Sequence, residues 1–249
     1  MTAPFDLWIG YFGALGSVTK WYGVFLNIRL VSAFLAIPLS SVFIFAGDNA
    51  TEPTRVDSRV FGVLPNYRTA DGTKPFSPID TRRKLHIAAK DSFDYPMFFL
   101  AGFYAAIGQL QNSNPSLGQG LGGYAQRYVR GYGDVVIGNF LTEGLLPSFL
   151  HEDPRYFRIG PGGGSRLHRT TYALTRVLVT KTDSGGRRFN FSEVLGNAAG
   201  VGIANAYYPD SRNLHDNLNR LGVQIGTDAA SNVLKEFWPD IRQKMFHRQ

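Results

Sequence analysis

The stretch GLGGYAQRYVRGYGDVVIGNFLTEGLLPSFL, residues 120–150, decides the fold class. It reads as one long helix, because no sustained alternation of apolar and polar residues runs through it. Pro147 lies near the end of this helix and predicts a bend or a break, since proline lacks the amide N–H that a helix interior needs. Strands have almost no support in the sequence after Asp80. We therefore expect an all-α protein.

Helix boundary signals on both sides of this stretch support the same class. Ser77 precedes Pro78, which predicts an N-cap followed by proline at the first helical position. Further helix starts are predicted at Asp94, at Ser165, at the capping box that Asn190 begins, and at Asn213, the last helix ending near residue 237 before Pro239. These segments predict a compact bundle of five or six helices.

The composition excludes several kinds of chemistry. The 249 residues include no cysteine, which rules out disulfides, thiolate metal sites and cysteine nucleophiles. Lys and Arg number 26 against 19 Asp and Glu, giving a net charge of +7. We expect an anionic membrane surface rather than nucleic acid to be the partner of this charge, because the arginines are scattered along the chain. We expect no cofactor and no metal.

An uncharged apolar run near the amino terminus predicts targeting to a membrane. Residues 30–47 read LVSAFLAIPLSSVFIFAG, a length at the lower edge of what spans a bilayer and also typical of a secretory signal. A buried helix kinked by Pro38 is the alternative. The expected organisation is a signal or anchor in residues 1–47, an extended Pro-rich arm in 48–80 and a helical domain in 81–249. The expected location is the cell envelope, with the protein either anchored or exported.

Small residues recur four positions apart in the later helices. Gly196 and Gly200 form one such pair, and Gly222 and Gly226 form another. Faces of this kind let helix backbones approach closely, as in membrane helix pairs. We expect these glycines to line helix contacts in which no side chain fits. Ordinary tight packing within a bundle is the alternative to association of a homo-oligomer through these faces.

Glu143 is the single residue whose surroundings most suggest a functional role. It stands alone among apolar neighbours, and a buried acid needs a partner, which is either a ligand or an arginine. The run His151-Glu152-Asp153 offers an imidazole and two carboxylates, but three consecutive helical residues point about 100° apart. A helix end stabilised by nearby arginines is the competing interpretation. His86 is a further candidate for the same site.

A basic segment follows the glycine-rich residues 160–164. Arg166, His168 and Arg169 lie at a predicted helix start, where backbone N–H groups and cations favour an anion such as a lipid phosphate. A simple linker between two helices is the alternative interpretation.

Three functions remain open on the sequence. The first is a non-enzymatic structural or scaffold protein of the cell envelope. The second is a membrane-associated hydrolase that uses Glu143, His151 and nearby acids. The third is a carrier of lipids or other apolar ligands. Convergence of His86, Glu143 and His151 in one concave pocket would favour the hydrolase, and a long apolar cavity would favour the carrier.

Overall fold

The computed structural model describes residues 59–60 and 64–246. The expected signal or anchor in residues 1–47 and the first part of the expected arm lie outside the described residues.

The described chain is mostly helical, which confirms the predicted helical bundle. Its α-helices are α2 (Thr81–Phe93), α3 (Tyr95–Leu110), α4 (Gly120–Asn139), α5 (Leu146–Leu150), α6 (Arg166–Thr175), α7 (Phe191–Ala204) and α8 (Leu214–Phe246). A π-helical segment, η5 (Phe140–Leu145), joins α4 to α5, and the short 3-10 turns are η4 (Pro115–Leu117), η6 (Pro161–Gly163) and η7 (Pro209–Ser211).

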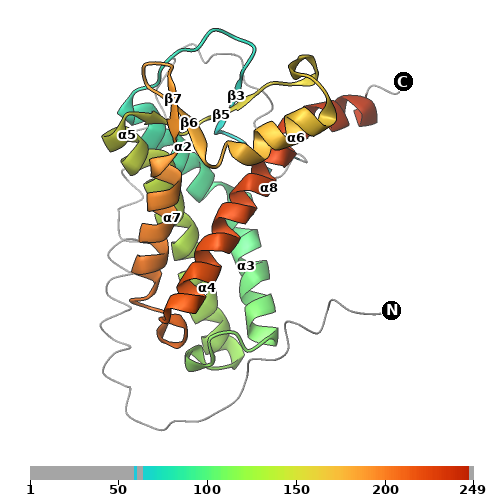
Figure 1. Cartoon of the computed structure of the whole chain (residues 1–249). Coiled ribbons are helices and arrows are strands. Elements are labelled where there is room, and N and C mark those ends of the chain that lie inside the picture. The colour runs from blue at the N-terminus through green and yellow to red at the C-terminus, as the bar shows by residue number, and fades with distance from the viewer. Residues whose placement is uncertain (1–58, 61–63, 247–249) are drawn as a thin grey trace.

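The long helices run along one axis, and the strands lie at one end of it. Figure 1 shows α3, α4, α7 and α8 along the long axis, with α6 and the labelled strands gathered at one end, which we name the strand end. The opposite end, which we name the loop end, holds the turns η4 and η7. There the apolar core cluster of Leu117, Ala204, Tyr207 and Tyr208 closes the bundle.

Short strands occur in the described chain, and those after Asp80 contradict the expectation of almost none there. The chain forms β1 (Arg59–Val60), β2 (Leu64–Pro65), β3 (Thr69–Asp71), β4 (Glu152–Asp153), β5 (Tyr156–Arg158), β6 (Val179–Thr182) and β7 (Arg187–Phe189). β6 and β7 form an antiparallel hairpin, β4 pairs antiparallel with β6, and β3 pairs parallel with β5. Strands of two to four residues are too short for an alternating pattern to reveal them.

Two predicted helix ends differ from the structure. The N-cap of α2 is Asp80, whose carboxylate accepts from the amide N–H of Arg83, rather than Ser77. The last helix continues through Pro239 to residue 246. Arg169 on α6 contacts α8 on both sides of that proline. Its guanidinium donates to the carboxylates of Glu236 and Asp240. The predicted starts at Asp94, Ser165 and Asn190 are N-caps as expected.

The glycine prediction holds at one of its four positions. A side chain at Gly196 would meet Thr142 Cγ2 at 2.7 Å, so α7 approaches η5 as closely as glycine allows. Among the described residues, a Cβ at Gly200, Gly222 or Gly226 would meet nothing within 4 Å. The prediction was therefore wrong at these three positions. Spacing alone does not tell a packed face from an open one.

Candidate functional site

Arg68 lies at the centre of a buried cluster of charged side chains. Its guanidinium donates to Glu143 Oε1 at 2.9 Å and to Glu193 Oε2 at 3.3 Å. Both carboxylates are buried, one in η5 and the other in the first turn of α7. Burial lowers the pKa of Arg68, but the two carboxylates outweigh this effect and raise the pKa above its ordinary value. Arg68 is thus held charged inside the bundle.

The cluster continues to α2 and α8 through further carboxyl groups. The carboxyl group of Asp91 lies against that of Glu143, and the carboxyl group of Asp228 lies against that of Glu193. Two carboxyl groups in contact need a shared proton, because ionised oxygens only accept. Asn197 Nδ2 connects the two acids of the second pair, since it lies 3.3 Å from Glu193 Oε1 and 3.3 Å from Asp228 Oδ2.

The charge balance of this cluster places protons on its acids. Four carboxyl groups (Asp91, Glu143, Glu193 and Asp228) face two cations (Arg68 and Lys235). Burial raises the pKa of Glu193 to about 8, although Arg68 opposes the shift. Burial also raises the pKa of Asp91, and the charge of Glu143 adds to it. At neutral pH Glu193 therefore keeps its proton, and Asp91 releases its proton only at a higher pH than an exposed aspartate does.

The π-helical segment explains why Glu143 faces the cluster. A π turn adds one residue to a helical turn and rotates the side chains that follow it. Glu143 and Thr142 are both buried, and Thr142 donates to the carbonyl of Gly138. Gly144 also lies close to α2, where an added Cβ would meet Leu85 Cδ2 at 3.0 Å. The segment is thus packed on two sides, against α2 and α7.

The acids of the run 151–153 have structural partners. Glu152 pairs with Arg188 at 2.9 Å and accepts from the amide of Ser192 at 2.8 Å, so it caps the first turn of α7. Asp153 pairs with Arg155 at 2.6 Å. His151 is 83% exposed and takes a left-handed backbone conformation with φ 56°. The run is therefore a helix end stabilised by arginines.

The other predicted site residues lie apart from Glu143. His86 lies beside Arg83 on α2, and its Nδ1 is 3.5 Å from that guanidinium. Arg169 is buried against α8, where it pairs with Glu236 at 2.8 Å. Arg166 and His168 are exposed in the first turn of α6. Across residues 59–60 and 64–246, no group of three or more His, Asp or Glu side chains is arranged to hold a metal ion.

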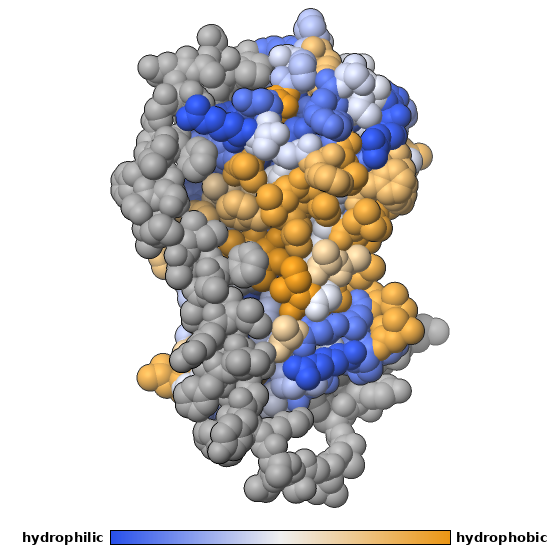
Figure 2. All heavy atoms as spheres, turned by 90° about the vertical axis from the view of Figure 1, so that its left-hand side faces the viewer, coloured by the Kyte–Doolittle hydropathy of each residue, from blue (hydrophilic) through white to orange (hydrophobic). Residues whose placement is uncertain are grey.

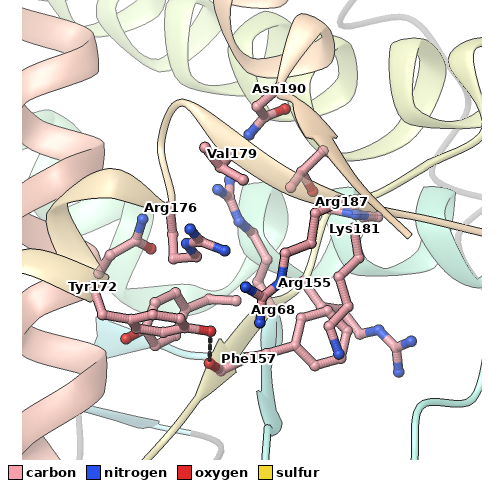
Figure 3. Close-up of a pocket in the computed structure, with 13 residues that line it drawn as sticks. Arg68, Arg155, Phe157, Tyr172, Arg176, Val179, Lys181, Arg187 and Asn190 are labelled. Carbon is pink, nitrogen blue, oxygen red and sulfur yellow. Dashed lines mark hydrogen bonds between the residues drawn. The ribbon is translucent and has the colours of Figure 1, made fainter. Parts of the chain in front are cut away.

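A strongly basic pocket opens beside Arg68 at the strand end. Its walls come from β5, the end of α6 and the β6–β7 hairpin, and Figure 3 shows Tyr172 and Phe157 along one side of it. Among the described residues, five of its lining side chains are cations and none is Asp or Glu; the cations are Arg68, Arg155, Arg176, Lys181 and Arg187. The cavity volume is about 30 Å³, enough for about two water molecules.

Large apolar side chains lie on the outside of the bundle. Figure 2 shows a broad apolar band on one face, between two polar regions. Exposed apolar residues occur on α3, α5, α7 and α8, among them Phe99, Phe103, Leu110, Phe149, Leu195, Leu214, Leu218 and Val223. In the part of the chain that the structure describes, no helix combines the length and the apolar character needed to cross a membrane.

No family model, curated protein or solved structure matches this chain. Sequence reasoning identified Glu143 but did not connect it with Arg68, Asp91 or Lys235. Arg68 lies in what was expected to be an extended arm, and no local signal marks it as a buried residue.

Proposed function

We propose that this protein is a non-enzymatic structural protein of the cell envelope that associates with an anionic membrane. The proposal rests on one observation, which is that many polar side chains are buried while many large apolar side chains are exposed. The buried side chains include as many polar and charged groups as apolar ones, while aromatic and aliphatic side chains lie outside. Soluble monomers seldom expose large contiguous apolar patches, and such patches mark contacts with membranes or other proteins.

Helix α3 supplies the clearest part of this surface. Its 16 residues, YPMFFLAGFYAAIGQL, carry no charge. Phe99 is 76% exposed, Phe103 61% and Leu110 87%, while its buried positions include the small residues Ala101 and Ala105. Phe99 and Phe103 are four residues apart and share one face. An apolar helix face with aromatic side chains is typical of segments that lie in the interfacial region of a bilayer.

Charge favours lipid over a second protein copy as the occupant of this surface. The chain carries a net charge of +7, so two copies would repel each other. Anionic headgroups attract basic side chains near a membrane surface by about 1 kcal/mol for each Lys or Arg. A homo-oligomer is the competing outcome of the test below.

The hydrolase alternative has little geometric support. Glu143 is buried against Arg68, whereas His151 is exposed at the end of α5. A carrier of apolar ligands is the second candidate, and one observation favours it. A pocket of about 240 Å³ lies between α3 and α4, with Met97, Leu100 and Val135 among its lining residues.

Flotation of the protein with lipid vesicles tests the proposal. The full chain and a form that begins at Asp48 are mixed with vesicles of anionic or zwitterionic lipid, so that residues 30–47 do not hide the effect of the described surface. We expect both forms to float with anionic vesicles. The double variant Phe99→Ser, Phe103→Ser should lose most of this binding in the form that begins at Asp48.

Leu167→Ser is the matched control, because Leu167 is 77% exposed but lies on α6 at the strand end. Sedimentation velocity tests the competing possibility that a second copy of the protein covers this apolar surface. If the wild-type protein fails to float and instead forms a dimer that Phe99→Ser, Phe103→Ser dissociates, the apolar face is a protein interface and the membrane proposal is wrong.

A further inference from the structure

Three cations of the basic pocket have no carboxylate partner. Arg68 is balanced by Glu143, and Arg155 is balanced by Asp153. By contrast, Arg176, Lys181 and Arg187 form no ion pair within the described residues. Their nearest recorded companions are aromatic, since Arg176 lies 4.7 Å from the centre of the Tyr172 ring and Lys181 lies 3.9 Å from that of Phe157. Asp153 lies close enough to raise the pKa of Lys181, but this carboxylate is already paired with Arg155, so positive charge remains in excess here.

The guanidinium of Arg176 indicates that the pocket lacks a hydrogen-bond acceptor. Its Nε is buried and has no hydrogen-bond partner among the described residues. A buried donor without an acceptor is costly, and native structures seldom keep one unless a ligand or water satisfies it. Burial lowers the pKa of Arg176 and of Lys181, and the charge of Arg187 adds to this effect at both residues. An anion in the pocket would remove each of these penalties.

We propose that this pocket binds a single phosphate group, carried either by a lipid headgroup or by a small soluble molecule. Arginine forks match the oxygen geometry of phosphate, and a phosphate group carries up to two negative charges at neutral pH. Three unpaired cations favour such a dianion over a monovalent carboxylate. The cavity of about 30 Å³ has room for no more than one small oxyanion, so the rest of the ligand molecule would lie outside it.

Arg68 gives the pocket its connection to the buried cluster. Its guanidinium donates to Glu143 and Glu193 on the inner side, and the same residue lines the pocket on the outer side. A bound phosphate would therefore lie next to a fixed positive charge that two carboxylates hold in place. The site does not depend on the proposed membrane association, since a soluble phosphate has the same chemistry as a headgroup.

Isothermal titration of the full chain with inorganic phosphate tests this inference. Acetate at equal ionic strength is the anion control. We expect phosphate to bind and acetate not to bind. Arg176→Gln should weaken phosphate binding at least tenfold, because a charge-assisted hydrogen bond is lost. Arg187→Gln serves as the second variant, because Arg187 is exposed and its replacement leaves the folded core intact.

Lys181→Gln and Lys244→Gln form a matched pair. Both remove one positive charge, but Lys244 is exposed in the last turn of α8, far along the chain from the pocket. Only Lys181→Gln should weaken binding. Vesicles with a phosphate-monoester headgroup distinguish a lipid headgroup from a small soluble phosphate as the ligand. Binding of either one supports the site. Equal affinity of all these variants, or no binding of phosphate in either form, overturns it.

Discussion

Replacing Glu193 by glutamine should make the stability of the protein less dependent on pH. The pKa of Glu193 is raised from an ordinary value of 4.5 to about 8, chiefly by burial. The folded chain thus keeps a proton that the unfolded chain releases above pH 4.5. Stability is therefore greatest at low pH with respect to this group, and it falls as the pH rises from about 4.5 towards 8.

The size of the change in stability follows from the difference in the pKa of Glu193 between the folded and the unfolded chain. One proton held only by the folded chain costs about 1.4 kcal/mol for each pH unit between the two pKa values. From pH 5.5 to 7.5 this amounts to roughly 3 kcal/mol where Glu193 titrates alone. Sharing of the proton with the neighbouring carboxyl groups spreads the loss over a wider range. Glutamine cannot ionise, and its amide can donate to Asp228 as the protonated carboxyl does.

Urea unfolding at several pH values measures this dependence in both proteins. The difference in unfolding free energy between wild type and Glu193→Gln should change steadily in favour of the variant as the pH rises. Glu143→Gln is the matched control in the same cluster, because Glu143 accepts directly from Arg68. That variant should lose about 2–4 kcal/mol, since a buried arginine is left with one partner. Parallel pH profiles for wild type and Glu193→Gln would refute the reasoning.

Three further predictions concern packing, ion pairing and targeting. Gly196→Leu should cost about 1–3 kcal/mol by overpacking against Thr142, whereas Gly200→Ala should be neutral or stabilising, and thermal melts distinguish the two. Glu236→Gln should cost about 3–5 kcal/mol in urea unfolding, because it breaks a fully buried ion pair with Arg169. Residues 30–47 should direct the chain to a membrane, so cell fractionation should find less membrane-bound protein for a form that begins at Asp48.

Local signals in the sequence were enough to find most helices. Ser165 and Asn190 each accept from a backbone N–H three residues later, as their residue types predict. Pro147 was expected to bend the long helix, and the structure places a π-helical segment just before it. The sequence could not predict that this segment is π-helical, because a π turn depends on packing against α2 and α7 rather than on residue type.

The buried cluster depends on contacts that the sequence does not reveal. Glu143 attracted attention because its neighbours are apolar, and its partner proved to be Arg68, 75 residues away along the chain. Residues 48–80 were expected to be an extended arm, since several prolines interrupt any periodic pattern there. The pairing of β3 with β5 brings Arg68 into the bundle, because Tyr156 N donates to the carbonyl of Arg68. Long-range pairing of this kind leaves no local trace.

The shared position of Arg68 couples the phosphate pocket to the protonation of Glu193. A bound dianion and an ionised Glu193 would compete for the same guanidinium, so each should disfavour the other. Asp91, Glu143, Asp228 and Lys235 belong to the same cluster and modify the strength of this competition.

Sulfate is the suitable probe of this coupling, because its charge does not change between pH 6 and 9, unlike that of phosphate. Sulfate affinity should fall by a factor of about three to ten across this range in the wild-type protein, a coupling of roughly 1 kcal/mol. In Glu193→Gln the affinity should vary less, since the group that titrates near pH 8 is gone. If wild type and variant lose affinity equally as the pH rises, Arg68 does not connect the two sites, and the pocket acts independently of the buried acids.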